Sequence, residues 1–547
     1  MNIIRDKVLY SSESPGPEEE STQRFFYRLL EELREELAET GDRTWILDTE
    51  TGDFHPISAI EPTARRVASA LTKLGFGPGD TVHTGYSSNL DFYWPVFGAW
   101  WCGGRASLAD PNLAPELISV QLEDTHAKVV VCSKQYVQKY SNIISDLSKE
   151  GTAPLLFVLD ATEDDVLPDN AASFGLLLRD DGQDAPSSAQ LPPYDPQEAA
   201  VVFWSSGSTG VPKGILHSHH TLNIMPASRG EVIERALMTN IQFHIGGFLF
   251  NLLLGISGRA VCHFVKENCF TAARVLDLVE IYRPDYLICG VSHFMKISNL
   301  ENTGRRFPGL KLISPMGGAI SPGVSRKVLS LLGSEVTLKE MYGSTEIGFI
   351  ATAKGHELQL GFLGQVGARN QVYIQDIKTG EKLGPNREGK IMARTPTMML
   401  GFLNRPEQTR EFFSEDGFGY TGDVGYYDDS GQFFYSYRMK DAMKVDNYWF
   451  GPGEIEEVLE SVPEIHEVGV WGEYNPDTGN ELINAAVVLS KSANGWDDGK
   501  IREYVKSRLP PTRQITGKVY FLDSLPHSPQ AKKLRGQIRE IVNRVEE

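Results

Sequence analysis

The sequence is poor in cysteine, has no long hydrophobic run and carries no excess of positive charge. Only five of its 547 residues are cysteine, and none has Cys-x-x-Cys spacing, so we expect neither a disulfide framework nor zinc ligation. The longest apolar stretch, residues 245–256, is interrupted by glycine and is too short to span a bilayer. The formal net charge of −19 argues against nucleic acid or an anionic membrane as a general partner.

Two targeting signals are also missing from the sequence. The first five residues lack the apolar core of a signal peptide, and the last three are not the peroxisomal Ser-Lys-Leu. We therefore expect a cytoplasmic protein without a transmembrane segment. The residues do not indicate an oligomeric state, which stays open.

The composition and the length are those of a multidomain globular protein. Apolar residues make up 41% of the chain and charged residues 23%, and 547 residues are too many for a single core. Residues 1–22 are polar and acidic, so we expect a loose N-terminal arm. Between residues 44 and 131, strand and helix patterns alternate, which predicts a mostly parallel α/β sheet.

The character of the chain changes twice in its second half. Turn signals between short strand patterns predict a small β-rich subdomain over residues 360–437, and the pattern after Arg438 predicts a compact α+β unit. The expected fold is α/β. It has a large domain of parallel α/β subdomains plus the β-rich subdomain over 23–437, a hinge at 438–441, and a small mobile α+β domain over 442–547.

A stretch rich in hydroxyl side chains and glycine follows an apolar run at 199–204, which predicts a buried strand. Glycines let the backbone approach an anion, hydroxyls donate hydrogen bonds, and a lysine adds positive charge. The spacing is not that of a Walker loop, and composition alone leaves a flexible turn as the alternative. We predict a polyphosphate site at Ser205, Ser206, Gly207, Ser208, Thr209, Gly210 and Lys213.

A second string, Tyr-Gly-Ser-Thr-Glu at residues 342–346, ends in a carboxylate, the ligand that a hard cation prefers. Alone, such a string is more often a capped loop with a solvated glutamate. Together, the two strings resemble the signatures of the adenylate-forming superfamily, which includes acyl- and aryl-CoA synthetases, beetle luciferases and peptide-synthetase adenylation domains. The resemblance covers approximately residues 40 to 540. In its length and in the wording of its motifs, the sequence is similar to luciferase-like acyl-CoA synthetases and coumarate–CoA ligases.

The resemblance implies roles for several residues around a bound nucleotide. Tyr342 and Gly343 would lie against adenine, Thr345 on the α-phosphate and Glu346 on Mg²⁺. The small residues Gly317, Gly318 and Ala319 match the segment that lies flat beside adenine. Asp423 and Arg438 match the pair that reaches the ribose, and His244 matches the histidine that orients the acid's carboxylate. We expect His217, His219 and His220, which follow the first string, to be structural.

Two lysines of the predicted small domain carry the remaining assignments. Lys532 matches the family's C-terminal catalytic lysine, although Ala531 replaces the usual glycine and the adjacent Lys533 leaves the register uncertain by one residue. Lys444 matches the lysine that enters the site after the small domain rotates. The sequence departs from its relatives at Tyr437 and Asp446, which puts the thiol-binding face in more doubt than the adenylating face.

The implied activity is a two-step acid–thiol ligation that uses ATP, Mg²⁺ and coenzyme A. A fatty or aromatic carboxylic acid would form acyl-AMP with release of pyrophosphate, and CoA would then take the acyl group. Light emission of the luciferase type is a minority alternative, because a second histidine after the Phe-His pair is replaced by Ile245. A nucleotide-binding sensor or scaffold without thioester synthesis is the other alternative.

Overall fold

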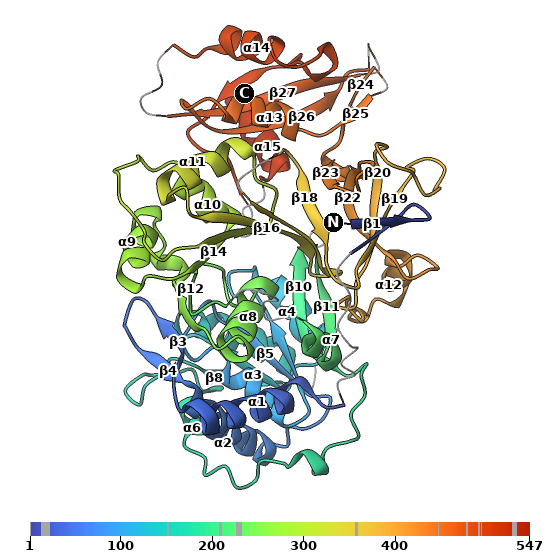
Figure 1. Ribbon diagram of the computed structural model, residues 1–547. Helices are drawn as coiled ribbons and strands as arrows, with labels where there is room; N and C mark the ends of the chain where they lie inside the picture. The colour runs from blue at the N-terminus through green and yellow to red at the C-terminus, as the bar shows by residue number, and fades with distance from the viewer. Residues whose placement is uncertain are drawn as a thin grey trace.

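The computed structural model describes most of the chain and places a small domain above a large one (Figure 1). The described residues are 2–11, 22–149, 153–206, 211–225, 232–355, 359–446, 448–476, 478, 480–490, 493, 495–527 and 533–546. Within them, no helix has the length and the apolar character that a membrane crossing requires.

The first sheet of the large domain is mostly parallel, as the alternation of strand and helix patterns predicts. Its central pairs β6/β5, β5/β7, β7/β8 and β10/β6 are parallel, whereas β11 pairs antiparallel with β10 and with β21. In order across the sheet the strands are β21 (Gly401–Phe402), β11 (Pro212–Ser218), β10 (Ala199–Ser206), β6 (Arg105–Leu108), β5 (Thr81–Gly85), β7 (Val129–Cys132), β8 (Leu155–Val158) and β9 (Ala171–Ser173).

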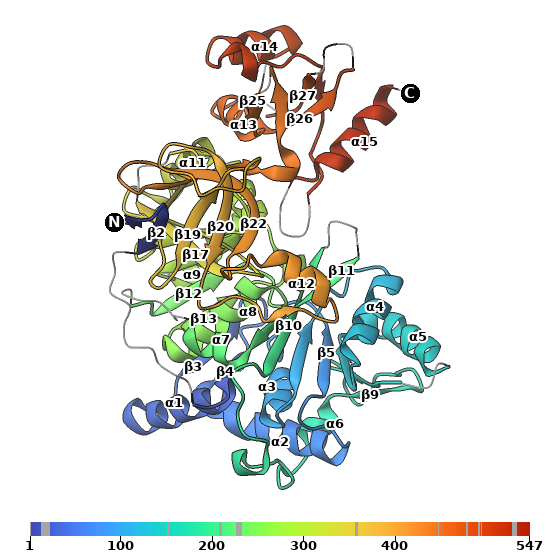
Figure 2. The same ribbon diagram turned by 90° about the vertical axis from the view of Figure 1, so that its right-hand side faces the viewer.

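The two faces of this sheet are covered by different helices. Along β7, Val129 and Val131 face the aromatic core around α3, whereas Val130 and Cys132 face a second core with α4 and α5. This alternation follows from the period of two along a strand. Because the strand is covered on both faces, its sequence is an uninterrupted apolar run. Figure 2 shows α4 and α5 together beside β5. The helices of this region are α1 (Phe25–Thr40), α2 (Ile60–Lys73), α3 (Trp94–Trp101), α4 (Pro115–Thr125), α5 (Val137–Ser148) and α6 (Gly175–Leu178).

The second sheet joins a parallel half to an antiparallel half at β16 and β17. Its order is β1-β2-β19-β20-β22-β23-β18-β17-β16-β15-β14-β12-β13-β3-β4. The parallel half contains β3 (Thr44–Asp48), β12 (Arg235–Met238), β13 (Val261–Phe264), β14 (Tyr286–Gly290), β15 (Leu312–Met316) and β16 (Thr337–Ser344), with β4 (Phe54–Pro56) at its edge. The helices alongside are α8 (Ile245–Leu252), α9 (Ala272–Tyr282), α10 (Val291–Ser298) and α11 (Pro322–Leu332), whereas α7 (His219–Ile224) packs on β11 of the first sheet and on α1.

The antiparallel half is the β-rich subdomain that the turn signals predict. It contains β17 (Gly348–Gly355), β18 (Phe362–Val366), β19 (Gln371–Gln375), β20 (Gly389–Arg394), β22 (Gly419–Tyr427) and β23 (Phe433–Arg438), and α12 (Pro406–Phe412) packs nearby. Its core is built from the alternate apolar residues of these strands, such as Val372 and Ile374 on β19.

The expectation of a loose N-terminal arm is wrong for residues 2–11. They form a hairpin of β1 (Asn2–Arg5) and β2 (Val8–Ser11), and β2 pairs antiparallel with β19. The Asn2 side chain donates to the carbonyls of Gly364 and Gly431, and Leu9 is fully buried. Backbone pairing and one buried leucine therefore outweigh the acidic composition. Residues 12–21 lie outside the described part of the chain.

The small domain is an α+β unit, as predicted. A three-stranded sheet of β26 (Ile465–Tyr474), β27 (Glu481–Leu489) and β28 (Val519–Phe521) packs with α13 (Gly453–Glu460), α14 (Asp498–Lys506) and α15 (Arg535–Glu546), and a hairpin of β24 (Met443–Val445) and β25 (Tyr448–Phe450) lies beside it. The predicted hinge at 438–441 coincides with the end of β23 and a single 3₁₀ turn over Met439–Asp441. Its movement stays a prediction.

Candidate nucleotide site

The predicted phosphate loop joins two strands of an antiparallel pair. The buried strand expected before it is confirmed, and β10 runs two residues beyond the predicted end, so that Ser205 pairs with Lys213 and Ser206 with Pro212. The Lys213 ammonium lies 5.5 Å from the ring centroid of Phe402. The loop proper, Gly207, Ser208, Thr209 and Gly210, lies outside the described residues, as does the Ser206 side chain.

The second signature forms the tip of a hairpin between β16 and β17. Gly343 sits at a register shift, and a Cβ there would be 2.3 Å from the carbonyl oxygen of Gly348, so only glycine fits. The backbone N–H of Ile347 donates to the Ser344 hydroxyl at 3.2 Å. Thr345 and Glu346 therefore lie next to each other in the turn that joins β16 and β17.

His217 connects the two signatures. It lies on β11, four residues after Lys213, and its Nε2 donates to the backbone carbonyl of Thr345 at 2.7 Å. Burial lowers the pKa of His217 to about 4, although this hydrogen bond acts in the opposite direction. A neutral imidazole therefore holds the second signature against the strand that leaves the first. The sequence places His217 close after the loop, but its contact is with a residue 128 positions away.

Three predicted nucleotide-binding residues contact one another directly. Asp423 on β22 lies opposite Arg438 on β23, and the Arg438 Nε is 3.0 Å from the Asp423 Oδ1. The Tyr342 hydroxyl donates to the other carboxylate oxygen at 2.7 Å. A carboxylate has about four acceptor positions, so Asp423 can accept from these two groups and still from ribose hydroxyls. The structure brings Tyr342, Asp423 and Arg438 together, as the predicted roles require.

The predicted adenine wall directly follows the end of β15. Gly317, Gly318 and Ala319 are exposed, and Gly317 has a φ of 104°, which disfavours any residue with a Cβ. A Cβ on Gly318 would meet its first neighbour, a Val291 methyl, only at 3.8 Å. The three residues therefore form an accessible surface without large side chains, on which a flat ring can lie.

His244 is at the N-cap position of α8 rather than within the helix. It is half-buried, and its ring centroid is 4.5 Å from that of Phe243. Two residues later, a Cβ on Gly246 would be 3.0 Å from the terminal methyl of Met316, the last residue of β15. The start of α8 therefore packs on the strand that leads into Gly317, which brings His244 into the neighbourhood of the predicted adenine wall.

Glu346 fits the predicted magnesium role. Its side chain is half-buried, and among the described residues no lysine or arginine pairs with its carboxylate. The described residues also contain no cluster of three side chains suited to a metal. Magnesium is usually held by one or two carboxylates together with substrate phosphates. A single carboxylate at a hairpin tip, without a cation partner in the described chain, is therefore compatible with the predicted magnesium role.

One carboxyl group near the site was missed by the sequence analysis. Glu340 lies on β16 two residues before Tyr342 and so points to the same side of the strand. Burial raises its pKa to about 7, and no cation pairs with it in the described part of the chain. The period of two and an acidic residue inside a strand were the available signals.

The small-domain lysines stand apart from these residues. Lys444 lies on β24, where its backbone N–H donates to Glu481 and its ammonium is 6.0 Å from the ring centroid of Trp449. No contact joins Lys444 to the large domain among the described residues. Lys532 lies outside the described part of the chain, whereas Lys533 is described and pairs with Glu456 and Glu460 at 16% side-chain exposure.

The two departures from the family pattern have local structural explanations. Tyr437 packs on the small domain, because a Cβ on Gly451 would be 2.1 Å from the Tyr437 Cβ. Asp446 adopts a left-handed φ of 48° at the β24–β25 turn, and Asn480 donates to its carboxylate at 2.9 Å. Aspartate is among the few residues that tolerate this conformation. Tyr437 thus stabilises the contact with residue 451 of the small domain, and Asp446 stabilises the β24–β25 hairpin.

Comparisons with known proteins found two family models that match most of the chain. A family model described as AMP-binding enzyme matches residues 33–403, and one described as AMP-binding enzyme C-terminal domain matches residues 454–532. The chain is 26% identical over 528 residues to 4-coumarate–CoA ligase 2 of Petroselinum crispum, with 92% of each chain covered. It is 27% identical to 4-coumarate–CoA ligase 3 of Oryza sativa subsp. japonica, with 92% of this chain and 90% of that one covered.

Two solved structures have a similar fold. The ATP-bound MatB of Rhodopseudomonas palustris superposes with a TM-score of 0.80 at 21% identity, covering 96% of this chain and 99% of that chain. A benzoate CoA ligase from Burkholderia xenovorans superposes with a TM-score of 0.79 at 20% identity, covering 94% and 100%. At these identities the superpositions establish the arrangement of a large α/β domain and a small α+β domain.

Proposed function

Since the chain belongs to the AMP-binding enzyme family, we propose that it activates a fatty or aromatic carboxylic acid with ATP and transfers the acyl group to coenzyme A. In the first step, a carboxylate oxygen of the acid attacks the α-phosphorus, and pyrophosphate leaves to give acyl-AMP. In the second step, the CoA thiol attacks the acyl carbon, and AMP leaves to give acyl-CoA. This reaction is an AMP-forming acid–thiol ligation.

The contact of Tyr342 with the Asp423–Arg438 pair is the observation that carries the proposal. It joins a carboxylate for the ribose and an aromatic ring for adenine on three strands of one sheet, β16, β22 and β23. The exposed surface of Gly317, Gly318 and Ala319 provides a place for the other side of the base. Because these groups are fixed by strand pairing, a nucleotide would meet a site that needs little rearrangement.

The phosphates would lie between the two signatures. Ser205, Ser206, the 207–210 loop and Lys213 would contact the β- and γ-phosphates, and Thr345 would contact the α-phosphate. Glu346 would hold Mg²⁺, which supplies positive charge against the triphosphate. His217 keeps Thr345 close to β11, so it is a positioning residue for this arrangement.

The reacting groups complete the proposal. His244 would orient the acid's carboxylate at the start of α8, and Lys532 would donate to the α-phosphate and the attacking oxygen as charge develops there. Lys444 would act in the second step, after the small domain rotates about residues 438–441. Both lysines belong to the small domain, so each half-reaction would use a different face of it.

The test is a panel of fatty and aromatic acids assayed with the purified protein, ATP and Mg²⁺. Pyrophosphate release without CoA reports adenylation, acyl-CoA formation reports the full reaction, and light with a luciferin reports the oxygenase alternative. The Lys532→Ala variant, purified identically, is the control for contaminating ligases. ATP binding without pyrophosphate release from any acid would contradict the proposal and favour the sensor alternative.

A further inference from the structure

The two domains meet where α11 of the large domain contacts α13 of the small domain. The Gly323 N–H at the start of α11 donates to a Glu457 oxygen at 3.2 Å, and the Arg326 guanidinium lies 3.7 Å from the same oxygen. Further along both helices, the Lys327 ammonium donates to the Glu460 carbonyl at 3.3 Å. The domains therefore dock here through polar groups at the start of α11 and in the second half of α13.

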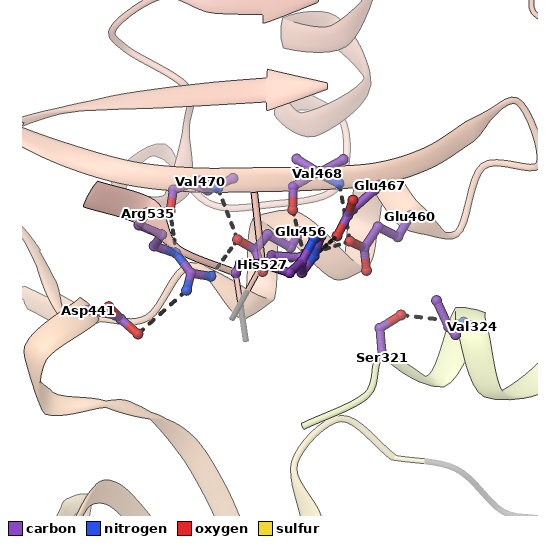
Figure 3. A network of polar contacts seen from close by, with 11 residues as sticks. Ser321, Val324, Asp441, Glu456, Glu460, Glu467, Val468, Val470, His527 and Arg535 are labelled. Carbon is purple, nitrogen blue, oxygen red and sulfur yellow. Dashed lines mark hydrogen bonds and ion pairs between the residues drawn. The ribbon is translucent and has the colours of Figure 1, made fainter. Parts of the chain in front are cut away.

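The start of α11 leaves one backbone N–H for a partner from another domain. Pro322 has no N–H, the Val324 N–H donates to the Ser321 hydroxyl at 3.3 Å (Figure 3), and the Ser325 N–H donates to the Ser321 carbonyl at 3.1 Å. Among the described residues, the Gly323 N–H is then the donor of the first turn that the large domain leaves unpaired. A carboxylate from the small domain accepts from it, at the end of a helix that favours negative charge.

Glycine at position 323 allows the small domain to come this close. A Cβ on Gly323 would be 3.3 Å from the Ser461 Cα and 3.5 Å from the Glu460 carbonyl oxygen. The first distance is shorter than the optimal separation of two carbon atoms, so the backbone after α13 would have to move away. The start of α11 is thus shaped for the docked position of α13.

The contact at Glu457 is incomplete, so that docking can be reversed. The Glu457 side chain is 17% exposed, and its second oxygen is buried without a hydrogen-bond partner among the described residues. Burial raises the pKa of this carboxyl, whereas Ser321 lowers it. A cavity of about 240 Å³ lies at the same interface and is lined by residues of both domains, including Lys327 and His466. Hydrogen bonds to α11 therefore replace only part of the water that the carboxylate loses.

A neighbouring face of α13 is fixed within the small domain by the lysine cluster, which consists of Lys533, Glu456 and Glu460 (Figure 3). The Lys533 ammonium lies 2.8 Å from a Glu460 oxygen and 3.2 Å from a Glu456 oxygen, and it donates to the Val468 carbonyl of β26 at 2.6 Å. Arg535 donates to the other Glu456 oxygen at 2.6 Å. These contacts join α13 to β26 and α15, so α13 moves together with the rest of the small domain.

The helix that Glu457 contacts begins directly after the predicted adenine wall. Ala319, the last residue of the wall, is followed by Ile320, which is 8% exposed, and Ser321 is already the N-cap of α11. A nucleotide on the wall and the docked small domain would therefore contact adjacent parts of one segment.

We propose that Glu457 is a positioning residue that holds the small domain in the orientation of the first half-reaction by capping α11, and that this contact breaks before the second. The inference rests on the proposed function, because it concerns which half-reaction the orientation serves. Lys444, which the proposed function assigns to the second step, has no contact with the large domain among the described residues. The docked orientation is thus left to adenylation.

The principal test compares E457A with E457Q, which keeps an oxygen for the Gly323 N–H. We expect E457A to release pyrophosphate about threefold to tenfold more slowly than the wild type, since one interdomain hydrogen bond is lost. Its Kd for ATP should stay within about twofold of the wild type, because the proposed nucleotide contacts are intact. Acyl-CoA formation from supplied acyl-AMP and CoA should be unchanged or faster, and E457Q should resemble the wild type in both steps.

The orientation of the small domain can be measured without catalysis. Spin labels at K506C and E335C, two exposed positions on the small and the large domain, report the distance between the domains in the presence of ATP and Mg²⁺. A C269S background is used, because the other four cysteines are buried. We expect one main distance when Glu457 is present and a second population in E457A.

Two further variants separate docking from stability. G323A adds a methyl group against α13 but favours the helix itself, so we expect a shifted distance and slower pyrophosphate release at an unchanged melting temperature. E454Q is the matched control on α13, because Glu454 pairs with Arg513 inside the small domain. It should behave as the wild type in distance and in both half-reactions.

Three outcomes would overturn the inference. They are an unchanged distance distribution in E457A, equal slowing of both half-reactions in E457A, and a loss in E457Q as large as that in E457A. Failure of the proposed function would appear in the wild type instead, as no pyrophosphate release from any acid. If the wild type adenylates and E457A matches it in rate and distance, only the positioning role is wrong.

Discussion

The Asp423–Arg438 pair proposed for the ribose and the small-domain cluster of Lys533, Glu456 and Glu460 are both ion pairs, but they are held in different ways. Asp423 and Arg438 face each other across β22 and β23, so backbone pairing fixes their separation. Lys533, Glu456 and Glu460 come from segments that are not strand neighbours, and their side chains supply the connection. Strand pairing therefore fixes the positions of the first pair, whereas the ion pairs themselves fix the positions of the residues in the cluster.

The difference teaches where each region is vulnerable. A change in the ribose pair removes a ligand contact but leaves the strand pairing that supports it. A change in the lysine cluster removes part of the scaffold itself, because an unpaired buried charge is costly. Variants of the large domain should therefore alter nucleotide affinity, whereas variants of the small domain should alter the rate of one half-reaction. The following predictions test this division, from the largest expected effect to the smallest.

The Lys532→Ala variant should show the largest loss. Without the ammonium, charge developing at the α-phosphate has no small-domain donor, and pyrophosphate release should fall at least about 1000-fold, or about 4 kcal/mol. ATP affinity, measured by calorimetry, should change little because the proposed nucleotide contacts lie in the large domain. If the turnover of Lys532→Ala were unchanged, the role proposed for this small-domain lysine in the first step would be wrong.

The Glu340→Gln variant tests the large domain without touching its ion pair. A carboxyl whose folded pKa is raised to about 7 stabilises the fold fully below its ordinary value of 4.5, and this contribution is lost as the pH rises through 7. Between pH 4 and pH 8 the wild type should lose up to about 3 kcal/mol relative to the variant. Urea unfolding at both pH values measures this, with the exposed Glu335→Gln as control. Parallel pH curves for wild type and Glu340→Gln would contradict the assignment.

The Asp423→Asn variant sharpens the comparison on the ribose side. It keeps the shape of the side chain but removes its charge, so Arg438 loses an ionic partner and the ribose loses a strong acceptor. We expect ATP affinity to fall about 30-fold, or about 2 kcal/mol, with the melting temperature nearly unchanged. Asp429→Asn, at an exposed turn, is the matched control. If affinity stayed constant while the rate fell, Asp423 would belong to the catalytic rather than the binding group.

The Lys444→Ala variant should have the smallest effect, confined to the second step. Lys444 makes no contact with the large domain in the described structure, so adenylation should proceed at the wild-type rate. Acyl-CoA formation from supplied acyl-AMP should slow about tenfold, or about 1.4 kcal/mol. Lys506→Ala provides the control. Equal slowing of both steps would show that Lys444 contributes to the stability of the small domain rather than to the second step.

Much of the fold could be predicted because its strands and helices have clear periods. The apolar run at 199–204 predicts β10, and the apolar alternation and helix signals after Arg438 predict the small domain. The hairpin at residues 2–11 could not be predicted, because its stability comes from pairing with β19, more than 360 residues away. Local composition carries no information on such a partner.

The candidate site was predictable where a motif is continuous in sequence. The resemblance of residues 203–214 and 342–346 to a known family indicated both signatures, and the contact of Tyr342 with Asp423 agrees with the predicted roles. The roles of His217 and Glu340 could not be predicted, because each depends on which strand lies opposite or which face is buried. The register between Lys532 and Lys533 was also ambiguous, and it is the pairing of Lys533 with two glutamates that favours Lys532 as the lysine available to substrate.

The β1–β2 hairpin has a practical consequence for anyone who produces this protein. Deleting residues 2–11 would uncover the outer edge of β19, whose backbone groups would then be free to recruit a strand from another molecule. Such a shortened protein should precipitate or self-associate even though its catalytic groups are intact. An affinity tag joined ahead of Asn2 should therefore be separated by a flexible spacer, and activity lost after trimming should first be examined by light scattering.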